Sequence, residues 1–379
     1  MSKPRQDSKS GHVNLKMLAE HLQLSQTTIS LVLNNSPSAK SIPPETRQRV
    51  LDAAEKLNYR PNYFARSLRQ SKSMSVGVLA PDLSEGYFTR VMSGVVEELT
   101  AAKYFYFTAC HDWRPELMAE YPRMLVERAV DGFLLLNTPA EIDVPVPVVA
   151  ISAHGSEPNV THIVLDHVKA VSMAIHHLHQ LGHRRIAFMR GPKVIPDSEF
   201  RWEGIQQVAH ELGLTLDPAL ITRIDDGAWR DNNGKSSPAD KANPEKTSQD
   251  KTSHHPMSPE IGYEPMKQLL AHTREFTAIF CFNDIAAVGA IRALTEAGLR
   301  VPADVSVVGF DDIQSAAFYT PSLTTVRQPL NEMGKRGARI LLARIAQQTS
   351  EDPNPPDLTA EVIMEPELVI RESTGPARS

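Results

Sequence analysis

Polar and aromatic side chains of the kinds that bind small polar molecules recur where short apolar segments of this chain end. The candidates are Asp82, Tyr87, Phe88, Arg201, Asn283, Asp284, Asp311 and Asp312. Carboxylates, amides and a guanidinium form hydrogen bonds with hydroxyl groups, and aromatic rings offer flat apolar faces for stacking. Together they suit a ligand such as a sugar. Two other roles stay open: Asn283 or Asp284 can simply cap a following helix, and Tyr87 and Phe88 can be packing between lobes.

The elements that would position these side chains alternate in type from Met74 onward. Strand-like segments are Val76–Ala80, Tyr104–Ala109, Gly132–Leu136, Val146–Ile151, Ile186–Met189, Ala278–Phe282 and Val305–Gly309. Helical stretches between them include Phe88–Ala101, Ala170–Leu181 and Asp284–Ala297. Alternation with buried strands predicts parallel sheets covered on both faces, and there are too many strands for one small sheet. We therefore predict an α/β core of two parallel-sheet lobes, with ligand groups beyond the carboxyl ends of the strands.

Three short helical patterns precede the core. Asn14 and Ser25 are placed as N-caps of the first two, and Pro44 is a first-turn proline of the third. Two short helices across a tight turn, buttressed by a third, predict an all-α helix-turn-helix head. In that arrangement the start of the second helix, here Gln26-Thr27-Thr28, reaches base edges in the major groove of DNA. The alternative is a plain three-helix domain with a polar surface.

The charge distribution favours the DNA-binding interpretation. Residues 1–73 carry 12 Lys or Arg against 5 Asp or Glu, whereas the other 306 residues carry 28 against 40. A basic head on an acidic body is typical of a nucleic-acid-binding protein, whose affinity then falls with salt.

A possible hinge follows the head. Pro61 ends the third helix, and the next eight residues or so are too few to hold a helix alone in water. Arg66 and Arg69 suit phosphates, and Leu68 can wedge into a base step from the minor groove and bend the DNA. Alternatively, Leu68 caps the core domain.

Other features point to a reduced, soluble, cytoplasmic protein without a metal site. Cys110 and Cys281 are far apart, and neither a secretory signal nor an apolar run of ~20 residues is present. Residues 228–260 almost lack aliphatic side chains and are predicted to be a disordered insertion. The histidines at 176, 177, 179 and 183 do not gather on one helical face with a carboxylate, and His254-His255 is too little for a metal.

The sequence disfavours two other classes of protein, an enzyme and a solute-binding transport protein. No Walker A, G-x-G-x-x-G, G-x-S-x-G or H-E-x-x-H pattern occurs, so we predict no catalytic residue and no cofactor. A solute-binding transport protein would share the two-lobed core, but it requires export and has no use for a basic head.

A series of different sequence motifs covers nearly the whole chain, first in the head, then in the hinge and then in the core. They are Val13–Ala19, Leu24–Asn34, Thr46-Arg47, Leu57–Asn62, Ala65–Leu68, Leu181–Ile186, Arg201–Gly204, Phe282–Asp284, Asp304–Asp312 and Leu323–Gln328. With these motifs the chain resembles the lactose-repressor (LacI/GalR) family. The resemblance implies a periplasmic-binding-protein-like core and a sequence-specific transcriptional regulator, a repressor, controlled by a small effector.

The resemblance also implies roles for individual residues. DNA contacts are expected from Ser25, Gln26, Thr27, Thr28, Ser30, Asn34 and Tyr59 in the head, and from Asn62, Ala65, Arg66, Leu68 and Arg69 in the hinge. Effector contacts are implied for Asp166, Arg201, Asn283, Asp311 and Gln328, with Trp229 stacking on a sugar ring. Leu31 departs from the pattern, because some members have a base-reading Arg or His there, and the loop 35–43 is longer.

The expected assembly is a homodimer on a pseudo-palindromic double-stranded DNA operator, because two-fold protein symmetry implies two-fold DNA sites. Effector would close or twist the lobes and move the hinge roots near Ser73. The predicted division is a disordered tail (1–12), a helix-turn-helix domain (13–60), a hinge (61–73), the core (74–371) and a tail (372–379). The short tail has no tetramerising heptad, which favours a dimer.

Overall fold

The computed structural model describes residues 13–34, 36–59, 72–83, 86–224, 258–348, 358 and 361–378. The chain separates into two compact units, Met1–Ser73 and Met74–Ser379. The predicted tail 1–12, residues 60–71 of the hinge region and most of the predicted insertion lie outside the described residues. Within the described ranges, no helix is long and apolar enough to cross a membrane.

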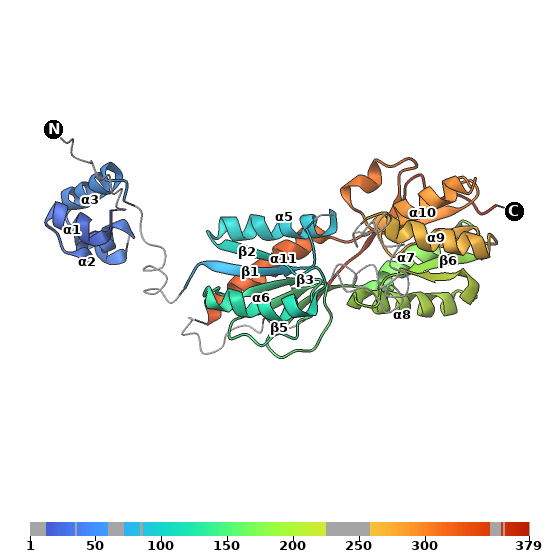
Figure 1. Cartoon of the computed structure of the whole chain (residues 1–379), viewed down its shortest axis with the longest axis horizontal. Helices are drawn as coiled ribbons and strands as arrows, with labels where there is room; N and C mark the ends of the chain where they lie inside the picture. The colour runs from blue at the N-terminus through green and yellow to red at the C-terminus, as the bar shows by residue number, and fades with distance from the viewer. Residues whose placement is uncertain are drawn as a thin grey trace, which may run out of the picture. The chain divides into compact units, whose positions relative to one another are not determined.

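The first unit is a bundle of short helices (Figure 1). Its elements are α1 (Leu15–Leu22), α2 (Gln26–Leu33), the 3-10 turn η1 (Pro37–Ser41) and α3 (Pro44–Lys56). The Asn14 side chain accepts a hydrogen bond from the Met17 N–H at 2.9 Å, and Ser25 Oγ accepts one from the Thr28 N–H at 3.0 Å. Both residues therefore cap their helices as their side-chain chemistry predicts. Leu18, Ile29 and Val50 form the buried centre between the three helices.

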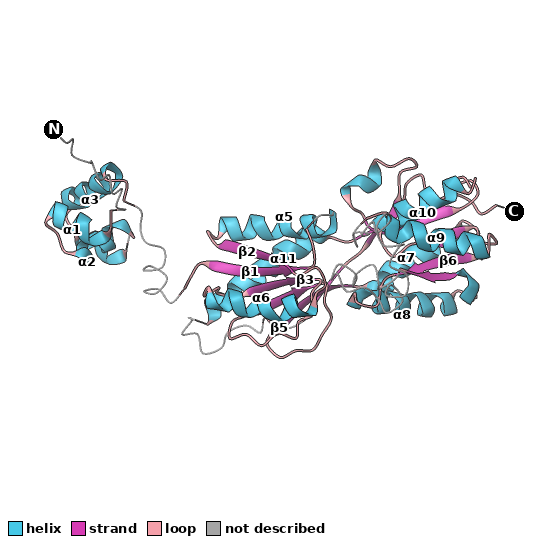
Figure 2. Cartoon of the chain, in the orientation of Figure 1, coloured by secondary structure: helices cyan, strands magenta, loops and turns pink. Residues whose placement is uncertain are grey.

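The second unit contains two six-stranded sheets (Figure 2). In order across the first sheet lie β11 (Val362–Met364), β5 (Val160–Leu165), β4 (Val148–Ile151), β3 (Phe133–Leu136), β1 (Ser75–Ala80) and β2 (Phe105–Cys110). The second has β12 (Glu367–Val369), β10 (Thr324–Arg327), β9 (Ser306–Asp311), β8 (Ala278–Phe280), β6 (Ile186–Arg190) and β7 (Ile221–Arg223). All neighbouring strands are parallel except β12, which is antiparallel to β10. The predicted α/β core of two parallel-sheet lobes is confirmed.

Helices cover the sheets, as parallel strands require. The first lobe has α5 (Gly86–Ala101), α6 (Pro115–Glu127) and α11 (Leu330–Gln347). The second has α7 (His167–Gln180), α8 (Pro196–Glu211), α9 (Glu260–His272) and α10 (Asp284–Glu296), with 3-10 turns η2 (Pro218–Leu220) and η7 (Gln314–Ala317).

The chain passes between the two lobes three times. The passages run from β5 to α7, from β10 to α11 and from β11 to β12. Asp166 lies in the first passage: its carboxylate accepts a hydrogen bond from the Lys169 N–H at 2.9 Å and caps α7. Its own N–H donates to the Met364 carbonyl at 3.0 Å, so it ties the first passage to the third.

Glycines bring two helix pairs unusually close together. A Cβ added at Gly94 of α5 would lie 2.0 Å from the Asn331 carbonyl oxygen, and one at Gly334 of α11 would lie 2.0 Å from that of Val91. In the second lobe, a Cβ at Gly262 of α9 would meet the Ala286 carbonyl oxygen of α10 at 1.9 Å. In each lobe, helix backbones are thus in direct contact at positions where no larger residue fits.

The predicted C-terminal tail is wrong as far as residue 378, because this segment completes the second lobe. Ser373 is fully buried, and its hydroxyl accepts from the Thr324 N–H at 2.8 Å and donates to the Val307 carbonyl at 2.6 Å. His183, one of the four histidines near α7, is also buried and contacts the Gly375 carbonyl at 3.0 Å. The predicted insertion, 228–260, also ends too late in the sequence, because α9 already begins at Glu260.

Candidate functional site

One pocket gathers polar and aromatic side chains from both lobes of the second unit. It is lined by Tyr87, Phe88, Trp113, Asn137, Ile195, Asp197, Arg201, Phe282, Asn283, Asp311 and Gln328, and encloses about 440 Å³ of empty space including its opening to solvent. Most of these residues follow the carboxyl end of a strand, where parallel sheets place their ligands.

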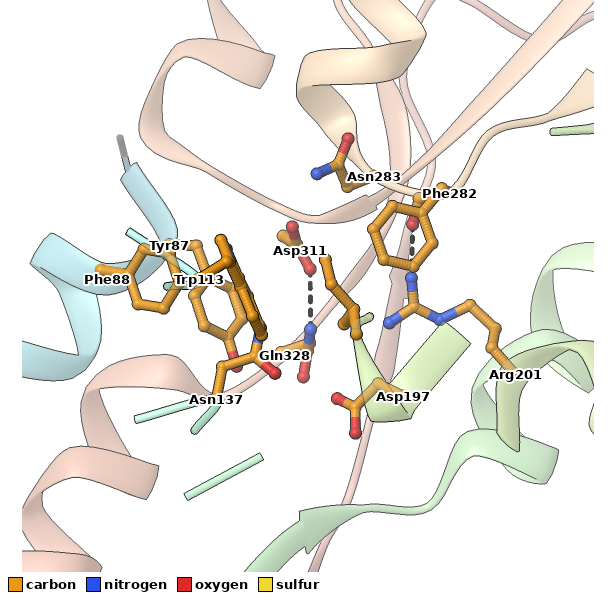
Figure 3. Close-up of a pocket in the computed structure, with 11 residues that line it drawn as sticks. Tyr87, Phe88, Trp113, Asn137, Asp197, Arg201, Phe282, Asn283, Asp311 and Gln328 are labelled. Atoms are coloured by element: carbon orange, nitrogen blue, oxygen red, sulfur yellow. Dashed lines mark hydrogen bonds between the residues drawn. The ribbon is translucent and has the colours of Figure 1, made fainter. Parts of the chain in front are cut away.

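An aromatic wall forms the side of the pocket that belongs to the first lobe. The rings of Tyr87 and Phe88 meet edge to face, with centroids 5.0 Å apart, and Trp113 lies beside them (Figure 3). The Tyr87 hydroxyl donates to Ser152 Oγ at 2.5 Å, and burial raises the pKa of Tyr87 well above its usual value. The wall is therefore uncharged and rigid, as stacking against a flat ligand requires.

Arg201 provides the cation on the opposite side. Its guanidinium lies over the Phe310 ring at 3.6 Å and the Phe282 ring at 4.7 Å, and it donates to the Phe282 carbonyl (Figure 3). Burial lowers the pKa of Arg201, although Asp311 and Asp197 oppose that shift, and a guanidinium stays charged at neutral pH. The two rings hold this charge in one orientation.

Asp311 faces Arg201 across the pocket floor. Its backbone φ is 111°, an unusual value for a residue with a side chain. Gln328 Nε2 donates to Asp311 Oδ1 at 2.7 Å (Figure 3). Burial raises the pKa of Asp311 to about 7, even though Arg201 and the Gln328 hydrogen bond both lower it. Near neutral pH this carboxyl can therefore either donate or accept a hydrogen bond.

The two candidates that end β8 have different roles. Asn283 lines the pocket and also caps α10, since its Oδ1 accepts from the Ala286 N–H at 2.8 Å; the cap is present, and the ligand contact stays a prediction. Asp284 is fully buried outside the pocket lining, and burial raises its pKa. It accepts hydrogen bonds from the Ile313 N–H at 2.8 Å and the Thr325 hydroxyl at 2.6 Å. Asp284 thereby fixes the loop that carries Asp311.

Several buried polar atoms of the pocket have no hydrogen-bond partner within the described part of the chain. They are Asn137 Oδ1, Asp197 Oδ1, Arg201 Nε and Gln328 Oε1. Buried polar atoms are normally paired, because each unpaired one costs about 1–3 kcal/mol. A ligand with hydroxyl or amide groups fits such an environment, and a purely apolar ligand does not.

The structure brings six of the nine predicted effector residues into this pocket. They are Tyr87, Phe88, Arg201, Asn283, Asp311 and Gln328. Asp82 and Asp166 lie elsewhere: Asp82 Oδ1 accepts from the neighbouring Leu83 N–H in the turn after β1, and Asp166 caps α7. Trp229 lies outside the described residues.

Sequence reasoning missed five lining residues. They are Trp113, Asn137, Ile195, Asp197 and Phe282. The rule of strand ends would have found two of them, because Asn137 directly follows β3 and Trp113 comes three residues after β2. Asp197 lies one helical turn before Arg201, a spacing that places both on the same face of α8.

The second helix of the head exposes polar side chains at its start. Ser25, Gln26 and Thr27 are exposed and Thr28 is half-buried, whereas Ser30 is buried. Asn34 Nδ2 donates to Ser30 Oγ at 3.1 Å, so Ser30 positions the exposed Asn34. Tyr59 is half-buried against the core of the head. The hinge candidates Asn62, Ala65, Arg66, Leu68 and Arg69 lie outside the described residues.

A helix-turn-helix unit joined to a two-lobed core with a polar ligand pocket defines a ligand-responsive DNA-binding regulator. Family models agree: residues 15–62 match the bacterial regulatory proteins of the lacI family, and residues 175–374 match a periplasmic binding protein-like domain. Residues 73–230 match the periplasmic binding proteins and sugar binding domain of the LacI family. The chain belongs to the lacI family of bacterial regulatory proteins. It is a transcriptional regulator and not an enzyme.

Relatives match over nearly the whole chain. The HTH-type transcriptional repressor PurR of Haemophilus influenzae is 32% identical over 95% of this chain and 98% of its own. CytR of Escherichia coli, another HTH-type transcriptional repressor, is 27% identical over 95% and 96%. Among solved structures, a complex of the regulator CelR with cellobiose is 25% identical with a TM-score of 0.64, covering 96% of this chain and 100% of its own. The Lac repressor dimer bound to operator has the same fold, with a TM-score of 0.76 at 24% identity over 96% of this chain and 100% of its own.

Proposed function

We propose that this chain is a transcriptional repressor whose operator affinity is set by a sugar or sugar derivative bound between the two core lobes. The observation that carries the proposal is the pocket itself, where an aromatic wall faces Arg201 and Asp311 among unpaired polar atoms. An aromatic face for a ring and polar groups for its hydroxyls are the two parts of a sugar site. Relatives named as repressors and a relative crystallised with cellobiose support it.

The partners follow from the family architecture. The protein acts as a homodimer that presents two heads to a pseudo-palindromic operator in the cytoplasm, and the start of α2 reads base edges. Gln26 and Thr27 are exposed there and free of the packing that holds Ile29. Leu68, which lies outside the described residues, is proposed to wedge into a base step of the minor groove.

Effector acts through the passages between the lobes. Ligand that contacts Tyr87 from one lobe and Arg201 from the other favours one relative arrangement of the two sheets. Because β1 begins two residues after Ser73, a change in the first lobe reaches the hinge root directly. Coupling of this type is typically worth about 1–3 kcal/mol between two sites.

The test begins with purified full-length protein and a selection of genomic fragments at moderate salt. We expect one short palindrome to be recovered, and its binding to change when mono- and disaccharides or nucleosides are added. Recovery of only sequence-blind, salt-sensitive binding in every condition would contradict the proposal.

Two variants test the pocket. Arg201→Ala and Asp311→Ala should each abolish the response to the effector while operator binding without effector and the thermal unfolding of the core persist. His210→Ala serves as the control, because His210 is exposed on α8 and does not line the pocket. A full effector response in both pocket variants would overturn the assignment of this site.

A further inference from the structure

Three metal-ligating side chains that are far apart in the sequence meet beside the pocket. His154 follows β4 by three residues, His167 is the first residue of α7, and Asp197 lies in the first turn of α8. His154 Nε2 is 3.5 Å from Asp197 Oδ1, and His167 Nε2 is 3.4 Å from Asp197 Oδ2. One donor atom from each residue lies within 4.8 Å of the other two.

The donor atoms are buried and unsatisfied. His167 and Asp197 are each only 5% exposed, and His154 is 16% exposed through its side chain. His154 Nε2, both ring nitrogens of His167 and Asp197 Oδ1 have no hydrogen-bond partner among the described residues. Buried polar atoms normally have a hydrogen-bond partner, so four such atoms without one in a single cluster are unusual. A neutral imidazole offers one ring nitrogen as a lone-pair donor, so a cation that accepts one lone pair from each of the three residues would satisfy most of these atoms.

The rings are held in place by their surroundings. The His154 ring lies on Phe200, with centroids 3.9 Å apart, and the His167 ring stacks on Phe310 at 6.4 Å. Arg201 is the cation nearest in sequence on α8, but its guanidinium is held between Phe282 and Phe310. Aromatic packing and the two ion pairs with Asp197 thus hold the donors in place.

We propose that His154, His167 and Asp197 form a binding site for a divalent transition-metal ion of the zinc class. Bonds of about 2.0–2.2 Å from a tetrahedral ion place neighbouring donors roughly 3.3–3.6 Å apart. Each histidine nitrogen lies at such a distance from one oxygen of Asp197, Oδ1 for His154 and Oδ2 for His167, and one donor atom of each residue lies within 4.8 Å of the other two. Two imidazoles with one carboxylate suit zinc and its neighbours, whereas calcium and magnesium prefer oxygen ligands alone.

The site has two structural consequences. Three protein ligands leave a fourth position open, as in zinc sites that bind an exogenous group. Asp197 also lines the pocket, so this position is next to the space for a small ligand. Since His154 comes from the first lobe and Asp197 from the second, a bound ion would also join the two lobes. No sequence pattern predicts this cluster, because its members lie at positions 154, 167 and 197 on separate segments of the fold.

The experiment titrates metal-stripped full-length protein with Zn²⁺ in competition with a chromophoric chelator, and needs neither effector nor operator. We expect one tight site per chain, weakened at least tenfold in Asp197→Asn and in His154→Gln. His210→Gln is the matched control, because His210 is an exposed histidine on the same helix as Asp197 and its loss should leave the tight site intact. Co²⁺ should give visible absorption bands in the wild type that disappear in the two site variants.

Two outcomes would overturn the proposal. One is that the wild type binds Zn²⁺ no more tightly than Asp197→Asn does. The cluster would then be an ion-pair network without a metal site. The other is a tight site that both variants retain. Thermal unfolding of each variant accompanies the titration, and if Asp197→Asn does not fold, the less buried His154→Gln decides. Failure here leaves the repressor function untouched, since operator and effector binding are measured separately.

Discussion

Burial and the groups around Asp311 act in opposite directions on the protonation of its carboxyl group. Burial favours its protonated form, while Arg201 and the amide of Gln328 favour the carboxylate. The positive φ of Asp311 adds backbone strain that the surrounding loop must hold. A side chain kept in this state at some cost to stability is typical of a binding site.

The raised pKa of Asp311 predicts a pH dependence of stability. The Asp311 carboxyl has a pKa of about 7 in the folded state and the usual aspartate pKa of 3.8 in the unfolded chain. Between these two pH values the folded protein holds a proton that is released on unfolding. The contribution of Asp311 to the free energy of unfolding is then largest below pH 4 and falls by up to about 1.4 kcal/mol per pH unit as pH rises towards 7.

Denaturant titrations of the wild type and Asp311→Asn between pH 4.5 and 6.5 measure this term. The difference in unfolding free energy between the two proteins should shift with pH in favour of the variant as pH rises. A constant difference over that range would show that Asp311 is ionised throughout.

Arg201 should not be replaceable by lysine, although the charge is kept. A lysine ammonium cannot lie flat between Phe282 and Phe310 while it donates to the Phe282 carbonyl. We expect Arg201→Lys to weaken effector binding at least tenfold, measured by isothermal titration calorimetry. Arg190→Lys is the control, because Arg190 stacks on Trp202 outside this pocket and should leave effector affinity nearly unchanged.

A pocket residue can be predicted from sequence when its side chain has only one plausible structural role. The prediction fails when the same side chain can either contact a ligand or cap a helix. Arg201 and Asp311 follow strand ends and lie where that rule places them. Asp166 follows a strand end as well, but its carboxylate is used to cap α7. A short carboxylate before a helix serves either purpose, and only the three-dimensional structure shows which.

At the scale of elements, the glycine contacts between α5 and α11 determine how closely these helices approach. An exposed glycine within a helix is usually improved by alanine, by about 1 kcal/mol. Here the added methyl group would meet the Val91 carbonyl 2.0 Å away, so the helices would have to separate. Packing therefore outweighs helix propensity at this position.

We expect Gly334→Ala to destabilise the core by about 2 kcal/mol or more, seen as a lower midpoint in thermal or denaturant unfolding. Arg336→Ala, an exposed change two residues away on the same helix, controls for helix propensity and should alter stability little. Equal or greater stability of Gly334→Ala would mean that the two backbones are not in contact.

The elements that sequence patterns found are the strongly apolar ones, such as β1, β3 and β9. β10 escaped prediction because Thr324 and Thr325 look polar, yet both are fully buried and their hydroxyls bond to Thr374 and Asp284. The segment after Arg371 escaped for the same reason. Buried hydroxyls paired within the fold behave as core residues, and no apolar periodicity reveals them.

For the whole molecule, two-site coupling makes a reciprocal prediction. If effector changes operator affinity by some factor, operator must change effector affinity by the same factor, because both are binding free energies of one cycle. Operator titrations with and without effector, and effector titrations with and without operator, measure the two factors on the same full-length protein. Unequal factors would mean that a third equilibrium, such as dissociation of the dimer, also changes.

The first lobe draws on both halves of the core sequence, since β1 to β5 precede residue 166 while α11 and β11 follow residue 329. During synthesis on the ribosome, the head emerges first and can fold at once around its own small core. The first lobe must wait, with the surface of α5 around Val91 and Val95 uncovered, until almost the whole message has been translated. A chain that ended before α11 would therefore leave this surface of the first lobe uncovered.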